Sequence, residues 1–131
     1  MNLLLDTHAF IWFIAGNQLL SKKARAVIEK TDNSIFISIV SLYEIAIKLK
    51  IGKIGFDKPV SAFFNDISEY NLTLIPISEN HLVAYDSFPL RSNHKDPFDR
   101  LIIATAIADD LSIVTVDNQF NHYKDLVSIL W

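Results

Sequence analysis

The chain has 131 residues, half of them hydrophobic, and a formal net charge of −3 from 12 Lys and Arg against 15 Asp and Glu. This is the length of one ordinary domain and leaves no room for a second independent core, so we expect a single domain over residues 1–131. The lack of cysteine excludes disulfides, thiolate catalysis and cysteine-based zinc sites. Because the balance of charge is acidic, any contact with nucleic acid must be local or assisted by a metal.

The apolar N-terminus does not have the pattern of an export signal. Asp6 and His8 interrupt the apolar run, and no Lys or Arg precedes Lys22, so the positively charged first part of a signal peptide is missing. No stretch approaches the roughly 18 to 20 uninterrupted apolar residues of a membrane span. We therefore expect a soluble, cytoplasmic protein that does not contact a membrane.

Short apolar runs alternate with helical patterns along the whole chain. In chain order we expect a strand at 2–5, helices at 7–14 and 22–30, a strand at 35–40, a helix that begins at 41 and is broken by glycine at 52, a helix at 60–67, a strand at 72–77, a helix at 79–85, a loop at 87–96, a helix at 97–108, and strands at 112–116 and 126–130. This alternation predicts an α/β fold, a three-layer sandwich with a mainly parallel sheet of about five strands. Near-continuous apolar strands are typical of a sheet that is buried on both faces.

Four acidic side chains occupy related places in this pattern. Asp6 directly follows the first strand and Asp117 the fourth, while Glu44 and Asp99 are expected on the first turns of helices that come after the second and third strands. The carboxyl ends of parallel strands share one edge of a sheet, where ligands usually bind. We therefore expect these four carboxylates to meet at one rim.

Each of these acids also has a purely structural explanation. Asp6 can cap a helix, and Asp117 with the asparagine after it can form an Asx turn. Ser41-x-x-Glu44 matches the capping-box pattern, and Asp96 can cap the helix that contains Asp99.

The joint placement of the acids argues for more than capping. Two like charges about 4 Å apart repel by roughly 4 kcal/mol at an effective dielectric near 20. Clustered acids therefore have raised pKa values or require a cation. Mg²⁺ binds oxygen ligands and phosphate, and one or two such ions can activate water against a phosphodiester.

No other catalytic constellation competes with the four acids. The histidines have no metal-ligand spacing such as H-E-x-x-H, and they are His8, His81, His94 and His122. Neither a phosphate-binding P-loop nor a dinucleotide fingerprint occurs.

Four segments of the sequence contain the expected acids and their neighbours: LLDTH at 4–8 with Trp12 after it, SLYEI at 41–45, HKDPFDRLI at 94–102 and VTVD at 114–117. In these segments the sequence resembles a PIN domain, and specifically the toxins of VapBC-type toxin–antitoxin pairs. The four segments span nearly the whole chain in the correct order, and the DPFDR segment before an alanine-rich helix is the most specific of them.

The resemblance implies a PIN-like parallel sheet, an acidic Mg²⁺ or Mn²⁺ site and endoribonuclease activity. It places Asp6, Glu44 and Asp99 as the three core acids and Asp117 as a more variable fourth. It also implies that the partners are RNA and a cognate antitoxin protein, in a homodimer or a hetero-oligomer with the antitoxin. Candidate interface residues are Trp12, Phe13, Phe63 and Phe64.

Further residues flank the expected site. Asp96 is a helix cap or an outer acid, and the hydroxyls of Thr7 and Thr115 hold metal-bound water or a ligand carboxylate, or else bond to the local backbone. His94, Lys95 and Arg100 are candidates for contact with RNA phosphates, with Arg100 alternatively a partner of a neighbouring acid.

Two other functions remain open from the sequence. A phosphoryl-transfer enzyme with Asp6 as its nucleophile lacks the usual second aspartate two residues on, because position 8 is His. A non-catalytic binding module would use the acids only as caps. Binding of a divalent metal distinguishes this last function from a nuclease.

Overall fold

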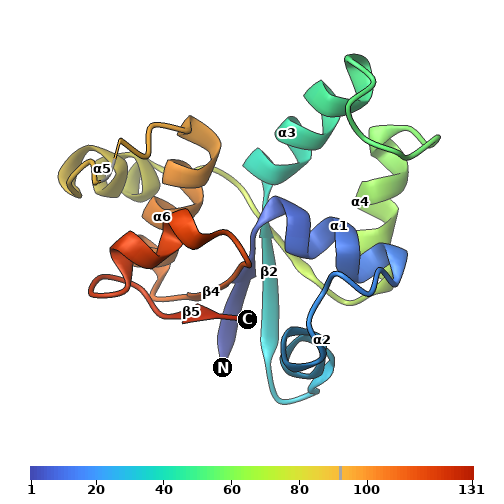
Figure 1. Cartoon of the computed structure of the whole chain (residues 1–131), viewed down its shortest axis with the longest axis horizontal. Helices are drawn as coiled ribbons and strands as arrows, with labels where there is room; N and C mark the ends of the chain where they lie inside the picture. Colours follow the sequence, from blue (N-terminus) through green and yellow to red (C-terminus); the bar gives the residue numbers. More distant parts are fainter. Residues whose placement is uncertain (92) are drawn as a thin grey trace.

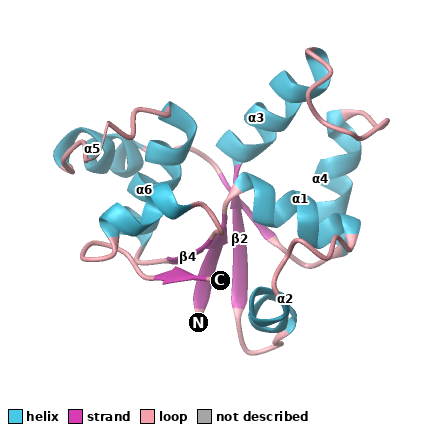
Figure 2. Cartoon of the chain, viewed as in Figure 1, coloured by secondary structure: helices cyan, strands magenta, loops and turns pink. Residues whose placement is uncertain are grey.

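Five parallel strands form one sheet at the centre of the molecule (Figures 1 and 2). The strands are β1 Asn2–Leu5, β2 Ser34–Ser38, β3 Thr73–Ile75, β4 Ser112–Val114 and β5 Ile129–Leu130, in the spatial order β3-β2-β1-β4-β5. In the register, Leu4 of β1 lies opposite Phe36 of β2 on one side and Ile113 of β4 on the other. This computed structural model describes residues 1–91 and 93–131, and it confirms the expected α/β fold with a parallel sheet.

Helices cover both faces of the sheet. They are α1 Thr7–Ala15, α2 Lys22–Glu29, α3 Ile39–Lys50, α4 Val60–Glu69, α5 Glu79–Ser87, α6 Pro97–Asp109 and the 3₁₀ helix η1 Asn118–Tyr123. Figure 1 shows α1, α3 and α4 to the right of the strands and α5 and α6 to the left. Within the described part of the chain, no helix is long and apolar enough to cross a membrane.

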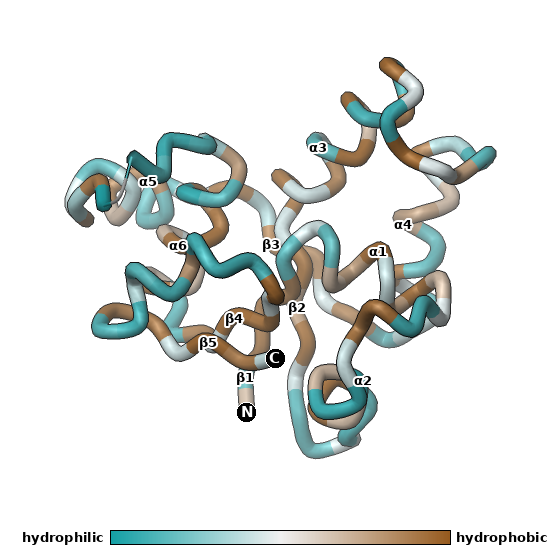
Figure 3. The backbone as a smooth tube through the Cα atoms, in the orientation of Figure 1, coloured by the Kyte–Doolittle hydropathy of each residue, from teal (hydrophilic) through white to brown (hydrophobic). Residues whose placement is uncertain are grey.

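Strand β1 supplies both hydrophobic cores because its side chains alternate between the two faces of the sheet. Leu3 and Leu5 pack with α1, α2, α3 and α4, whereas Leu4 packs with α6 and η1. All three leucines are fully buried. In Figure 3 the hydrophobic strands accordingly lie at the centre, with hydrophilic residues toward the outer surfaces of the helices. A central strand buried on both faces explains why its sequence is continuously apolar.

The first core corrects part of the interface prediction. Phe63 is fully buried in it and does not reach the surface, whereas Phe13 is mostly buried but lines a cavity that opens to the surface. Trp12 and Phe64 are only partly buried and remain candidates.

Helix α3 begins earlier than the sequence pattern predicts. Ser38 is its N-cap, with the side-chain oxygen accepting a hydrogen bond from the Val40 amide at 3.1 Å. The second strand therefore ends at Ser38 and not at 40. As a consequence Ser41 and Glu44 lie inside the helix, the capping box expected at these residues does not exist, and Glu44 is on the second turn.

The first strand has the predicted bounds, β3, β4 and β5 are shorter than predicted, and the 3₁₀ helix after β4 was not expected. Its N-cap is Asp117, whose side chain accepts from the Gln119 amide at 2.9 Å. The Asx turn considered for Asp117 is thus the start of η1. The remaining helix boundaries agree with the expected ones to within two residues.

Candidate functional site

Asp6 joins two neighbouring strands at the carboxyl rim of the sheet. It follows β1 and caps α1, with Oδ1 accepting from the Ala9 amide at 2.7 Å. Its Oδ2 accepts a hydrogen bond from the Thr115 hydroxyl, which comes just after β4. The side chain is buried, and this burial is the main cause that raises the pKa of Asp6 from 3.8 to about 6; the two hydrogen bonds oppose the shift, and the charges of Asp117 and Glu44 add to it.

Asp99 reaches the same rim from the first turn of α6. Asp96 is the N-cap of this helix and accepts from the Phe98 amide at 2.9 Å and the Asp99 amide at 3.1 Å. The Asp99 carboxyl lies 3.1 Å from Nε2 of His94. Burial raises the pKa of Asp99 to about 6, the His94 hydrogen bond opposes the shift, and the charges of Asp96 and Asp117 add to it.

Asp117 links these two carboxyls electrostatically. It is exposed on the segment after β4, and its amide donates to the Thr115 hydroxyl oxygen at 3.0 Å. Its negative charge raises the pKa of both Asp6 and Asp99. Asp6 is more than 90 positions away from both Asp99 and Asp117 in the chain, so the fold brings carboxyls from distant parts of the sequence within electrostatic range of one another.

Glu44 belongs to the site but differs from the other acids. The Thr7 hydroxyl lies 2.7 Å from its Oε1 and 3.0 Å from the Ser41 hydroxyl oxygen. Its Oε2 lies 3.1 Å from Nζ of Lys48, one turn further along α3. Glu44 therefore has a cationic partner, whereas no Lys or Arg forms an ion pair with Asp6 or Asp99 among residues 1–91 and 93–131.

The chemistry of these donors fits a hard divalent cation. Asp6 and Asp99 have raised pKa values because each is removed from water and lies near further negative charge, from Asp117 and Glu44 for Asp6 and from Asp96 and Asp117 for Asp99. A cation relieves both effects. Over the described residues, however, no group of three or more His, Cys, Asp or Glu side chains lies together so that it could hold a metal ion.

The structure corrects the prediction for Arg100. Its side chain is buried, with the guanidinium carbon 4.2 Å from the centre of the Phe88 ring and 5.0 Å from that of Tyr85. Its Nη2 donates to the Phe88 carbonyl at 3.4 Å. Arg100 therefore makes cation–π contacts in the layer of α5 and α6, where it reaches neither an RNA phosphate nor a neighbouring acid.

His94 is also buried, so a role in phosphate binding does not fit its position. Its ring lies 5.8 Å from each of the rings of Phe120 and Tyr123, and its Nε2 is directed at Asp99. His94 thus holds the carboxyl of Asp99 in place. Lys95 is exposed beside the N-terminus of α6 and keeps its predicted role as a candidate phosphate contact.

Sequence reasoning missed two partners of the acids. The ion pair of Lys48 with Glu44 has the i,i+4 spacing of a helical pair, which the sequence itself displays. The contact of His94 with Asp99 has no such signal, because it depends on how the loop before α6 folds back onto that helix.

The chain is similar to known proteins over nearly its whole length. Residues 3–126 match the family model of the PIN domain. Ribonuclease VapC22 of Mycobacterium tuberculosis is 31% identical over 124 residues, which cover 92% of this chain and 91% of that protein.

Two solved structures illustrate the similarity of fold. VapBC2 from Rickettsia felis, bound to a DNA fragment from its promoter, matches with a TM-score of 0.70 and 20% identity over 100% of this chain and 99% of the other. VapBC-5 from Mycobacterium tuberculosis, a member of the VapBC family of toxin-antitoxin systems, matches with a TM-score of 0.61 and 18% identity over 98% of this chain and 95% of the other. The matched lengths include the sheet and all four acids.

Proposed function

The chain belongs to the PIN-domain family, and from this premise we propose that it is a divalent-metal-dependent endoribonuclease that hydrolyses RNA phosphodiester bonds as the toxin of a toxin–antitoxin pair. The observation that carries the proposal is the pair formed by Asp6 and Asp99. These carboxyls come from distant parts of the chain, Asp6 is buried and Asp99 is half-buried, and both have a pKa raised to about 6 near the charge of Asp117. The 31% identity to a ribonuclease supports RNA as the substrate.

Asp6, Asp99 and Asp117 are the residues that would hold Mg²⁺, or Mn²⁺ in its place, directly or through water, with Glu44 further out. When bound, the ion supplies positive charge for the phosphate and a water that ionises more readily. Thr115 and the Ala9 amide fix the orientation of the Asp6 carboxyl, and His94 fixes that of Asp99.

Hydrolysis adds the oxygen of one water to phosphorus and releases the ribose oxygen of the next nucleotide. The proton of the attacking water needs an acceptor at the rim, and the leaving oxygen takes a proton from solvent. A carboxylate of the rim that does not bind the ion is suited to accept that proton, and of the four acids Glu44 lies furthest out. Exposed Lys95, at the start of α6, is placed to pair with a phosphate of the substrate.

The test is incubation of the purified protein with total RNA in Mg²⁺ and in EDTA, followed by sequencing of the cut ends. We expect discrete cuts that require Mg²⁺ or Mn²⁺ and disappear in Asp6→Ala and Asp99→Asn. Undiminished cleavage in EDTA would contradict the proposal.

The proposed partner is an antitoxin protein encoded beside the toxin gene. The matched structures are VapBC complexes, which supports a partner of this type. Co-expression with the adjacent small reading frame should relieve growth inhibition in the cytoplasm, and co-purification should show a hetero-oligomer. Growth inhibition that the neighbouring protein leaves unchanged would argue against this role.

The structure makes the phosphoryl-transfer alternative less suitable. A nucleophilic aspartate needs an oxygen that is free to attack, whereas both carboxyl oxygens of Asp6 accept hydrogen bonds, and burial disfavours its charged form. No observation specifically favours the non-catalytic module, since helix capping alone would not require the acids to share one rim.

A further inference from the structure

A cleft adjoins the acidic rim on the side of Asp117. Its volume is about 330 Å³, and its walls come from α2, the segment after β4, η1 and the end of the chain. The side chains that matter for its chemistry are Lys23, Asn118, Asn121, Lys124 and Trp131. Asp117 and Thr115 line it as well, so the cleft is continuous with the candidate active site.

The two lysines of this cleft are exposed and have no acidic partner. Within residues 1–91 and 93–131, neither Lys23 nor Lys124 forms an ion pair, whereas Lys48 and Lys58 are paired with carboxylates. Other lysines of the described residues also have no ion pair, so what distinguishes Lys23 and Lys124 is that both line one cleft together with Asp117. This distribution is complementary to an anionic polymer that passes from the rim into the cleft.

Aromatic rings lie beside the same path. Trp131 is partly exposed and meets Trp12 edge-on, with ring centres 5.9 Å apart. Trp12 in turn lies 5.6 Å from the ring of His8, on the first turn of α1 close to Asp6. Unpaired bases stack on such rings with little preference for sequence, because every base has a π-face.

From the ribonuclease function proposed above, we propose further that this cleft is a binding subsite for single-stranded RNA next to the phosphate that is cut. Lys23 and Lys124 pair with backbone phosphates, and one base stacks on Trp131. A volume of about 330 Å³ is at the small end for ligand sites, which suits a single unpaired nucleotide better than a helical duplex.

The two asparagines give the subsite a means to discriminate bases. Both are exposed, and Nδ2 of Asn121 lies 3.5 Å from Oδ1 of Asn118. This weak contact leaves amide donors and acceptors on both side chains for the edge of a stacked base. The base next to the cut is therefore expected to be non-random in the sequenced ends.

The first test measures RNA binding without cleavage. A fluorescent 12-nucleotide single-stranded RNA of random sequence is titrated in EDTA at several salt concentrations, with the intact chain as the reference. In Lys23→Gln/Lys124→Gln we expect weaker binding and a salt slope that is smaller by about 1.4, the value for two lost phosphate contacts on a single strand. The matched control is Lys30→Gln/Lys50→Gln, which removes the same charge from exposed lysines outside the cleft.

A second measurement probes stacking. In Trp12→Phe, Trp131 is the one tryptophan left, and its fluorescence should be quenched by single-stranded RNA but not by a duplex of equal length. Trp131→Leu should weaken binding at least about fivefold. Its circular dichroism spectrum reports whether the variant folds, and the exposed lysine variants provide the test if it does not.

The outcomes separate the two proposals. Equal weakening in the cleft and control pairs, absence of quenching, or equal competition by duplex RNA would overturn the subsite. If the wild-type protein then still cuts RNA with Mg²⁺, only the subsite is lost. If it neither binds nor cuts RNA, the ribonuclease function fails as well.

Discussion

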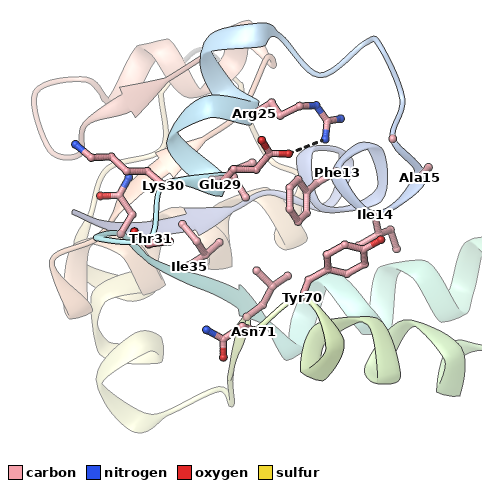
Figure 4. A pocket seen from close by; sticks show the side chains of 14 residues that line it. Phe13, Ile14, Ala15, Arg25, Glu29, Lys30, Thr31, Ile35, Tyr70 and Asn71 are labelled. Atoms are coloured by element: carbon pink, nitrogen blue, oxygen red, sulfur yellow. Dashed lines mark hydrogen bonds and ion pairs between the residues drawn. The ribbon is translucent and has the colours of Figure 1, made fainter.

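The two ends of the sheet contain different kinds of hollow, and the larger one is not the candidate site. A cavity of about 640 Å³ lies at the amino ends of β2 and β3, between the C-terminal ends of α1, α2 and α4 (Figure 4). Its acid, Glu29, is paired with Arg25 at 3.5 Å, and Phe13 meets Tyr70 edge-on at 5.4 Å. The carboxyl end of the sheet has less space but carries acids without Lys or Arg partners.

Helix direction explains why the charges separate in this way. The amide groups at a helix N-terminus carry partial positive charge, and the carbonyls at a C-terminus carry partial negative charge. Asp6 and Asp99 lie at the N-termini of α1 and α6, where the partial positive charge stabilises a carboxylate. The large cavity is bordered by the C-terminal ends of α1, α2 and α4, where the partial charge is negative. The volume of a cavity therefore does not indicate where the reaction takes place. Carboxylates without a Lys or Arg partner are the better indication.

The comparison is tested most strongly by neutralising one acid at each end. We expect Asp99→Asn to lower RNA cleavage by at least about 10³-fold, because loss of a metal ligand removes several kcal/mol of transition-state stabilisation. Glu29→Gln should leave cleavage unchanged, since its partner Arg25 is at the other end of the sheet. The measurement is the initial rate on one labelled RNA substrate with Mg²⁺.

Melting curves of both variants provide the control for folding. Removal of the charge of Asp99 also removes repulsion from Asp96 and Asp117, so this variant should be at least as stable as the wild type without metal. An equal loss of activity in Glu29→Gln would mean that the two ends do not differ in function.

The second prediction concerns a change at the large cavity that should affect stability and leave activity unchanged. Phe13 is buried against Tyr70 and lies beneath the guanidinium of Arg25, at 5.7 Å. Phe13→Ala should lower the free energy of unfolding by about 3 kcal/mol through lost burial and an enlarged cavity. Urea denaturation measures this value. The cleavage rate per folded molecule should stay unchanged, and a large drop in that rate would connect the cavity to the chemistry.

The third prediction concerns how much the buried carboxyl group of Asp6 lowers the free energy of unfolding. The pKa of Asp6 is raised in the folded state to about 6 from 3.8, so the folded protein holds this proton more tightly than the unfolded chain. Stability from this group is therefore present at low pH and is lost as pH rises from about 4 to about 6. Asp6→Asn cannot ionise and still caps α1. It should be more stable than the wild type by about 3 kcal/mol at pH 7 in EDTA.

The difference between the two proteins should shrink toward pH 4, where the Asp6 carboxyl is neutral in the folded state. Added Mg²⁺ should stabilise the wild type more than the variant. A stability difference that is the same at pH 4 and pH 7 would show that Asp6 is not held with a raised pKa.

The strands and the meeting of the acids could be predicted from the sequence because they depend on local patterns. Short continuous apolar runs define β1 and β2, and the parallel sheet then delivers Asp6 and Asp117 to one edge. Capping was predictable too: Asp6 and Asp96 are both N-caps. The pattern could not show that Asp6 is buried and Asp96 exposed, because burial depends on which elements pack over each cap.

Arg100 illustrates what the sequence could not supply. Next to Asp99 it looks like a phosphate ligand, but successive residues of a helix point about 100° apart. Asp99 therefore faces the rim while Arg100 turns into the layer of α5 and α6, onto the ring of Phe88. The partner on that face comes from a different element, and only the packed structure identifies it.

The prediction with the smallest expected effect tests which hydrogen bonds hold the carboxyl group of Asp6 in place. The Thr115 hydroxyl donates to Asp6 and lowers its pKa, and it also accepts from the Asp117 amide at 3.0 Å. Thr115→Val keeps the shape but removes both bonds, so the pKa of Asp6 should rise further. The pH at which cleavage is half-maximal should move upward, with a loss of a few-fold at pH 6 and less at pH 8, since one hydrogen bond is worth about 1 kcal/mol. Thr115→Ser should restore the wild-type profile, because it restores the hydroxyl. An equal loss at both pH values in Thr115→Val, with no rescue by serine, would mean that residue 115 acts through packing alone and that the carboxyl rim is positioned by its backbone.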